Sequence, residues 1–128
     1  MIKVPYYSEL VNLRIILEDS LPNFPELRCQ HSTRVVNRIL GLEERAGYYK
    51  PLDLWHAWNY DPNQGLYIDL TMDQFSGDHE PITILRDNTS LLSADDERTK
   101  FQIESFFDFY TESIERCVLI YRVMAAKS

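Results

Sequence analysis

Apolar residues recur at helical spacing near the start of the chain. In the segment YYSELVNLRIILEDSL they fall three or four residues apart, at Leu10, Leu13, Ile16 and Leu17. This spacing predicts an amphipathic helix, for which Ser8 is the expected N-terminal cap. The helix is expected to end at PNFPE, because Pro22 and Pro25 both resist helix continuation.

A second helix is predicted directly after this proline-bounded loop. The stretch LRCQHSTRVVNRIL leads into Gly41, a residue that commonly follows the last turn of a helix. We therefore expect a helix from about Cys29 to Leu40. The side chains of Cys29, Ser32, Val36 and Leu40 would share one side of it.

The middle of the chain carries strand signals. Aromatic and β-branched residues favour extended structure at 47–49, 53–60, 66–71 and 83–85. Between the second and third of these, DPNQG predicts a turn, with Pro62 near its start and Gly65 closing it. The sequence thus predicts three or four antiparallel strands.

The last third of the chain returns to a helical pattern. SADD, which begins at Ser93, resembles a capped helix start. Steps of four and three then join a stripe of Ile103, Phe107, Tyr110, Ile114, Cys117, Tyr121 and Met124. This pattern predicts one long helix or two nearly collinear ones. The expected fold is a single α+β domain over residues 1–128, in which an antiparallel sheet packs against an N-terminal helix, a cysteine-bearing helix and a long C-terminal helix.

Charge and composition limit the classes of binding partner that we expect. The 128 residues are 45% hydrophobic and carry a net charge of −7, values typical of a globular protein without a basic face. Nucleic acid and anionic membranes are therefore not expected as partners. The segment MIKVPYYSEL lacks a signal-peptide pattern, so we expect a cytoplasmic protein in which Cys29 and Cys117 are free thiols, although a disulfide between them stays open.

The predicted hairpin brings a histidine and an aspartate together. If the turn is centred on Pro62 and Asn63, the register places His56 opposite Asp69 and Trp58 opposite Tyr67. Directly opposed side chains lie ~4.5–5.5 Å apart at Cβ, which suits a carboxylate that holds an imidazole. A structural pair between two strands is the alternative interpretation of the same residues.

Cys29 gives this pair a chemical context. A helix N-terminus stabilises a thiolate through its unpaired N–H groups, and a neighbouring histidine stabilises it further and can carry its proton. Cys29, His56 and Asp69 therefore supply a nucleophile, a general base and the carboxylate that orients the base.

These residues also carry a resemblance. The helix start CxxS, then HAWN, then YIDLTMDQF resemble the Cys-His-Asp core of the papain-like superfamily, in particular its transglutaminase-like and related bacterial branches. The resemblance runs from Cys29 to Phe75 and implies the same three catalytic roles. Only 26 residues separate Cys29 from His56, so a small version of the fold is implied, without the substrate-binding loops of larger relatives.

Four further residues are candidates for the oxyanion hole or for substrate binding. Beside the Cys29 backbone N–H, the side chains of Asn23 and Gln74 are possible oxyanion donors. Trp58 and Tyr67 share the hairpin face of His56, where they could line a cleft or simply pack.

The sequence therefore supports a cysteine-dependent acyl-transfer enzyme that acts on an amide, with a protein, a peptide or a small amide as substrate and no cofactor. Peptidase, glutamine deamidase and transglutaminase chemistry all remain open. A non-catalytic acidic interaction domain is the alternative function. A metal site is not expected, because no C-x-x-C or H-x-x-x-H spacing is present, and a homo-oligomer stays open.

Overall fold

The computed structural model describes residues 2–104 and 107–127, without the side chains of 107–110. Within these ranges the helices are α1 (Tyr7–Ser20), α2 (Cys29–Leu40), α3 (Asp96–Glu104) and α4 (Phe107–Ala126). The strands are β1 (Glu43–Tyr49), β2 (Leu54–Asp61), β3 (Leu66–Asp69), β4 (Thr83–Arg86) and β5 (Leu92–Ala94). Two short 3₁₀ turns, η1 (Lys50–Leu52) and η2 (Met72–Gln74), follow β1 and β3.

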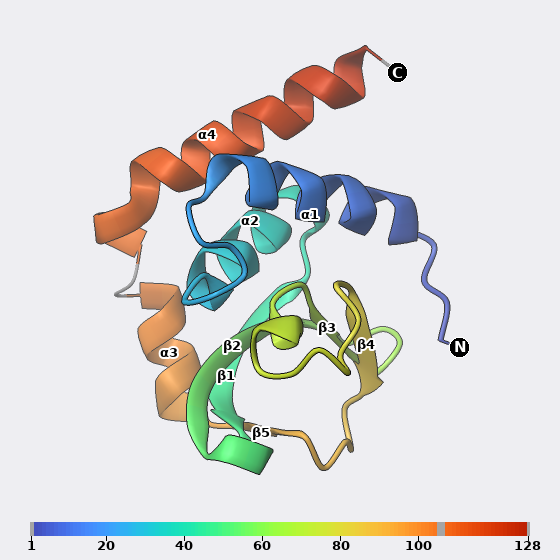
Figure 1. Cartoon of the computed structure of the whole chain (residues 1–128), viewed down its shortest axis with the longest axis vertical. Helices are drawn as coiled ribbons and strands as arrows, with labels where there is room; N and C mark the ends of the chain where they lie inside the picture. The colour runs from blue at the N-terminus through green and yellow to red at the C-terminus, as the bar shows by residue number, and fades with distance from the viewer. Residues whose placement is uncertain (1, 105–106, 128) are drawn as a thin grey trace.

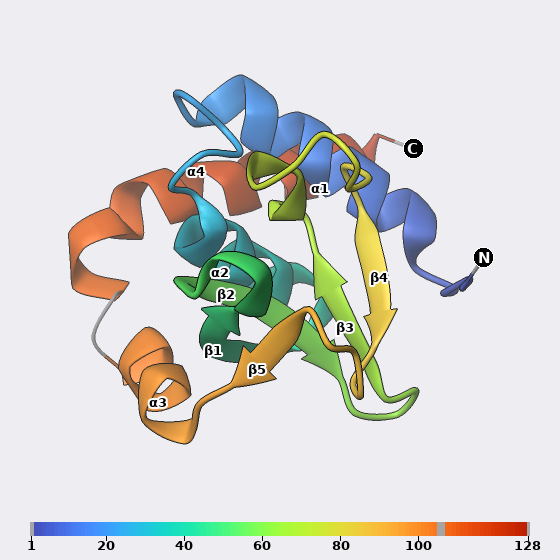
Figure 2. The same cartoon turned by 60° about the horizontal axis from the view of Figure 1, so that its bottom comes forward.

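The strands form one curled antiparallel sheet in the order β4-β3-β2-β1-β5. Helices α1, α2 and α4 are stacked on one side of it, with α2 against β1 and β2, while α3 lies beside β1 (Figures 1 and 2). The largest apolar core fills the space between these helices and the sheet. The α+β class is confirmed, with five strands instead of three or four. No helix in the described ranges is long and apolar enough to cross a bilayer.

The two N-terminal helices follow the hydrophobic pattern. The four apolar positions expected on α1 are all buried, but the helix begins at Tyr7 without a side-chain cap, so the prediction of Ser8 as its cap was wrong. Helix α2 runs over the expected residues, and Gly41 adopts a left-handed φ of 72° directly after it. The predicted ends of α2 are confirmed.

The register of the hairpin differs from the prediction. Asn59 pairs with Ile68, and Tyr60 pairs with Tyr67, a shift of two residues from the expected pairing. The cause is a four-residue loop closed by Gly65, whose N–H donates to the Asp61 carbonyl oxygen at 2.9 Å and whose φ is 65°. Direct opposition of His56 and Asp69 was therefore wrong. Because side chains alternate with a period of two, a shift by two keeps the same residues on the same face.

The C-terminal region forms two helices that point in different directions, not one helix or a collinear pair (Figure 1). Ser93 lies in β5, and the start of α3 is capped by Asp95, whose Oδ1 accepts the Arg98 N–H at 2.9 Å. On α4, Ile114 and Cys117 are fully buried as the stripe predicts, but Ile103 of α3 and Met124 near the end of α4 are 48% and 47% exposed, so the stripe is not buried along its whole length. The side chains of Phe107 and Tyr110 lie outside the described residues.

A buried ion pair joins α2, β1 and α3. Arg34 Nε lies 2.9 Å and 3.0 Å from the two carboxylate oxygens of Glu44, and both side chains are more than 90% buried. Arg34 Nη2 also donates to the carbonyl oxygens of Gln102 and Ile103 at the end of α3, each at 3.0 Å. The Gln102 amide completes the network with a 3.0 Å bond to Glu44. The bonds of the Arg34 guanidinium and the Glu44 carboxylate are charge-assisted, whereas the Gln102 Oε1 atom is buried without a hydrogen-bond partner among the described residues.

Replacing Glu44 with alanine should destabilise the protein by about 3–5 kcal/mol, since the Arg34 guanidinium would be left buried without a counter-charge. The matched control is Glu115→Ala, which removes the exposed partner of Arg38 and should have a much smaller effect, because solvent screens an exposed ion pair. Urea unfolding followed by circular dichroism measures both changes. Equal losses for the two variants would contradict the central role of the buried pair.

Candidate active site

The structure places His56 and Asp69 in direct contact. His56 Nε2 lies 2.6 Å from Asp69 Oδ2, and both side chains are almost completely buried. The other carboxylate oxygen, Oδ1, accepts the Thr71 N–H at 2.8 Å and the Thr71 hydroxyl at 3.1 Å. These bonds hold Asp69 in one orientation, so it in turn fixes the plane of the imidazole. The predicted contact is confirmed, although the residues meet diagonally across the hairpin.

The environment of His56 favours its charged form. Burial by itself lowers the pKa of this imidazole, but the charge and hydrogen bond of Asp69, together with the Cys29 thiol, outweigh burial and raise the pKa from 6.5 to about 10. His56 is thus an imidazolium at neutral pH, paired with a buried carboxylate.

Cys29 is the first residue of α2, and its thiol interacts with the His56 imidazole. Asp69 occupies Nε2. Nδ1 is buried and makes no hydrogen bond within the described residues. The structure brings Cys29, His56 and Asp69 together as the sequence predicts.

Small residues allow the start of α2 to approach the sheet. Cys29 packs against Ala46 of β1 and Ala57 of β2, with Trp55 at the edge of this cluster. The amide of Asn59 also donates to the Thr33 carbonyl oxygen at 3.0 Å, which ties α2 to β2. With 7% of its surface exposed, Cys29 has limited access to solvent.

The first turn of α2 offers backbone donors. Its N-cap residue, Arg28, contributes no side-chain hydrogen bond to the helix, and no acidic residue lies in the first turn. The Cys29 N–H is one of the four amides that an α-helix leaves without an internal partner. It lies beside the thiol and suits a developing oxyanion.

The two predicted side-chain donors for the oxyanion are placed differently. Gln74 is engaged at both ends, since Oε1 accepts the Leu27 N–H at 3.3 Å and Nε2 donates to the Thr71 carbonyl oxygen at 2.9 Å. It fastens the loop before Cys29 to the segment after Asp69. Asn23 lies exposed in that loop with a φ of 66°.

Of the two predicted cleft residues, Trp58 packs on His56 and Tyr67 packs on Trp58. Trp58 is 1% exposed and stacks beside the imidazole, with ring centroids 6.0 Å apart, while Tyr67 meets the Trp58 ring edge-on at 5.3 Å. Phe75, which the sequence reasoning did not single out as a site residue, packs edge-on against His56 at 4.9 Å. These rings keep water away from the imidazole.

Arg14 is a further residue that the sequence reasoning missed. From α1 it donates to both carboxylate oxygens of Asp73, at 2.8 Å and 2.9 Å, and to the carbonyl oxygen of Leu70 at 2.6 Å. Its guanidinium lies 4.9 Å from the centroid of the Phe24 ring. Arg14 thereby anchors the segment after Asp69 and the loop before Cys29 to the same helix. An arginine within a helical pattern gives no sequence signal for such a role.

The remaining titratable candidates lie apart from this site. Cys117 is buried in the main core, and both it and Cys29 are free thiols. Among the described residues, no group of three or more His, Cys, Asp or Glu side chains is arranged to hold a metal ion. His31 lies on the buried side of α2, where burial and the nearby Arg28 lower its pKa to about 4.

Comparison of the chain with protein-family models, with curated proteins and with solved structures gives no match.

The two buried histidines should show opposite protonation states at neutral pH. In an NMR titration of ¹³C-labelled histidine rings, His56 should stay protonated until about pH 10, whereas His31 should stay neutral down to about pH 4. Because the folded pKa of His56 lies above its unfolded value, the pairing stabilises the fold fully below pH 6.5, and this contribution is lost as the pH rises through about 10.

The Asp69→Asn variant tests whether the Asp69 carboxylate is what raises the pKa of His56. Without the carboxylate, only the Cys29 thiol opposes the effect of burial, so the pKa of His56 should fall well below about 10. The assignment would be contradicted if His56 titrated near 6.5 in both proteins.

Proposed function

We propose that the protein is a cysteine-dependent acyl-transfer enzyme in which Cys29 is the nucleophile, His56 the general acid and base, and Asp69 the orienting carboxylate. One observation carries the proposal. The imidazole of His56 is bound to Asp69 at 2.6 Å through Nε2, its other nitrogen makes no hydrogen bond within the described residues, and the Cys29 thiol at the start of α2 lies close enough to help raise the pKa of the ring. A structural histidine–aspartate pair needs no thiol at that place.

In the first half of the reaction the Cys29 thiolate attacks the carbonyl carbon of an amide, and the carbonyl π electrons move to oxygen. The tetrahedral intermediate collapses as the C–N bond breaks, and the His56 imidazolium gives its proton to the leaving amine. In the second half His56 takes a proton from water or from an acceptor amine. That nucleophile attacks the thioester and releases the Cys29 thiolate.

The oxyanion needs donors at the helix start. The Cys29 backbone N–H supplies the first. For the second we assign Trp55, because it packs against the cluster that contains Cys29 and its Nε1–H is buried without a hydrogen-bond partner among the described residues. A buried unsatisfied donor is costly unless a ligand uses it.

The resemblance to the papain-like superfamily agrees with this assignment. It implies a cysteine on a helix packed against an antiparallel sheet that carries the histidine and the aspartate, and a substrate of the amide class, either a peptide or a small amide. A cytoplasmic, reducing compartment would keep the thiol free. The chemistry calls for no cofactor.

One observation favours the second candidate, a non-catalytic interaction domain that retains the fold. Cys29, His56 and Asp69 are 7%, 0% and 3% exposed, so the site is almost closed. An enzyme must open at the loop before Cys29 to admit a carbonyl group, whereas an interaction domain has no such requirement.

Acylation by p-nitrophenyl acetate distinguishes the two candidates. The thiolate should displace p-nitrophenolate in a burst of one equivalent and leave an acetyl group on Cys29, located by mass spectrometry of peptides. The burst should disappear in Cys29→Ala and slow by about 10²-fold or more in His56→Gln. Trp55→Phe should slow it by about 10²–10³-fold if the indole is an oxyanion donor.

Cys117→Ala is the matched control, since it removes the other thiol and leaves the triad intact; its burst should equal that of the wild type. The enzyme assignment would be wrong if the acetyl group appeared on Cys117 or on lysines, or if His56→Gln reacted at the wild-type rate. The interaction domain would then be the better assignment.

A further inference from the structure

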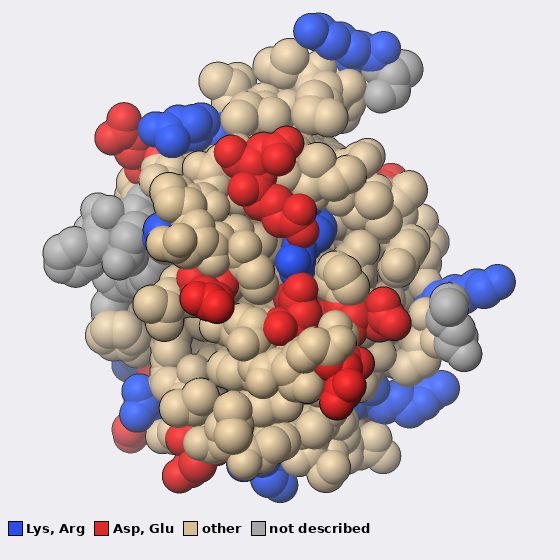
Figure 3. Space-filling view, viewed as in Figure 1, with Lys and Arg blue, Asp and Glu red and all other residues tan. Residues whose placement is uncertain are grey.

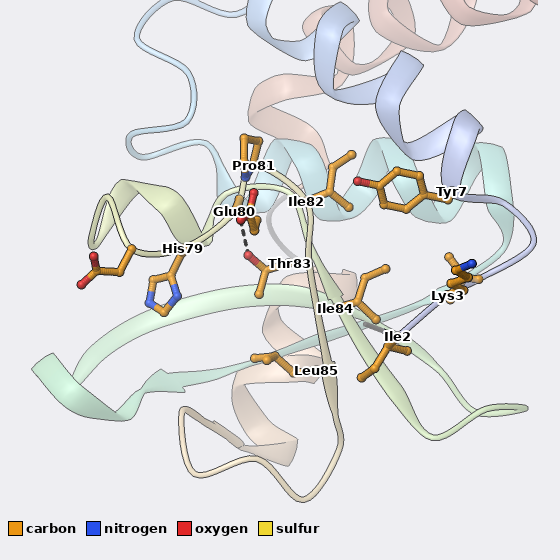
Figure 4. Close-up of a pocket in the computed structure, with 12 residues that line it drawn as sticks. Ile2, Lys3, Tyr7, His79, Glu80, Pro81, Ile82, Thr83, Ile84 and Leu85 are labelled. Atoms are coloured by element: carbon orange, nitrogen blue, oxygen red, sulfur yellow. Dashed lines mark hydrogen bonds between the residues drawn. The ribbon is translucent and has the colours of Figure 1, made fainter.

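A second feature lies away from the triad. A groove of about 880 Å³ runs between the N-terminal segment of residues 2–4 and the segment of residues 78–85, which ends in β4. In Figure 4, Ile82 and Ile84 lie between its two ends, with Lys3 at one end and His79 and Glu80 at the other. None of the triad residues lines the groove.

The wall formed by β4 is an open sheet edge. Strand β4 is the last strand of the order β4-β3-β2-β1-β5 and pairs with β3 on one side. The Asp87 N–H bonds to the Gly65 carbonyl oxygen at 3.0 Å, which sets the alternation of the ladder. It follows that Thr83 and Leu85 direct their backbone groups to β3, while Ile82 and Ile84 direct theirs outward.

The outward groups have no backbone partner in the described part of the chain. Residues 2–4 lie across the groove from β4, but no hydrogen bond joins them to it. The groove thus has the polar edge that an added strand requires. The half-buried side chains of Ile82 and Ile84, which pack against the main core, give it an apolar floor.

The charges around the groove are uneven. The exposed side chain of Glu80 lies at the end opposite Lys3. Asp78, two residues before it, is also exposed and also lines the groove. On the face seen in Figure 3, acidic side chains gather over α1 and over the segment between β3 and β4, whereas most basic side chains lie at the margin. A ligand with a basic group at the Glu80 end is therefore favoured by the local field and by the net charge of −7.

We propose that the open edge of β4 binds an extended peptide segment of a partner protein, which adds a strand to the sheet between β4 and residues 2–4. Apolar side chains at alternate positions of the peptide contact Ile82 and Ile84. A lysine or arginine at one end of the peptide pairs with Asp78 and Glu80. The binding does not depend on the reactivity of Cys29.

Random seven-residue peptides displayed on phage are the probe, with the Cys29→Ala protein as bait so that no covalent capture occurs. The selected sequences should alternate apolar and polar residues and carry a basic residue at one end. The best peptide, synthesised with a fluorescent label, should shift the amide NMR signals of Ile82, Ile84 and Arg86. A form of this peptide that is N-methylated at two backbone amides facing β4 should bind at least about tenfold more weakly, because two backbone hydrogen bonds to the strand are lost.

Two pairs of variants test the mode of binding. Ile84→Pro removes one outward N–H and should reduce affinity, while Ile84→Val keeps it and should bind like the wild type; a dispersed NMR spectrum verifies that the proline variant is folded. Asp78→Asn with Glu80→Gln should weaken binding at low salt. The same neutralisation of Asp96 and Glu97 on α3 should leave it unchanged.

Three results would overturn the proposal. The first is that no peptide is enriched over an empty support. The second is that the methylated peptide binds as tightly as its parent. The third is that the peptide shifts only NMR signals of residues away from β4. The proposal is also wrong if the protein associates with itself along β4 and the peptide then no longer binds, since a second copy of the chain would be the occupant of the groove.

Discussion

The hydrogen bond between Asp69 and His56 is the interaction on which the site depends. It joins two buried titratable side chains, and it is favourable because the charge on each compensates the burial of the other. The N–H and the hydroxyl of Thr71 both donate to the Asp69 carboxylate and fix its orientation, and the carboxylate in turn fixes the His56 imidazole. One ring nitrogen is thereby committed to Asp69, and the other is buried without a hydrogen-bond partner in the described part of the chain.

The rest of the fold holds Cys29, His56 and Asp69 close to one another. Ala46 and Ala57 let the start of α2 approach the sheet, and the Arg34–Glu44 pair secures α2 to β1 and α3. Arg14 anchors the segments on both sides of the site to α1. Gln74 links the same two segments directly. The arrangement of Cys29, His56 and Asp69 therefore depends on polar contacts in loops as much as on the apolar core.

The parts that could be predicted from the sequence are those set by local patterns. The bounds of α2 follow from its periodicity and Gly41, and the shared face of His56 and Asp69 follows from strand alternation. The hairpin register could not be predicted, because DPNQG suits both a two-residue turn and the four-residue loop that Asp61 and Gly65 form. Strand β5 is only three residues long, too short for a periodic signal.

Long-range polar contacts account for most of what the sequence does not reveal. Arg14, Arg34 and Glu44 resemble solvent-facing charges in the pattern, yet each is buried and paired. Gln74 was a candidate donor by its motif, but the loop geometry engages it at both ends. The roles of Arg14 and Gln74 depend on segments more than 40 residues apart and have no local signature.

The rate at which iodoacetamide alkylates Cys29 at pH 6 tests the central claim most directly. If the His56 imidazolium holds the thiol as a thiolate, the wild-type protein should react at least about tenfold faster than His56→Gln, and Cys117→Ala should react like the wild type. If Cys29 is equally slow with and without His56, the thiol is a structural residue and the three side chains do not form a catalytic unit.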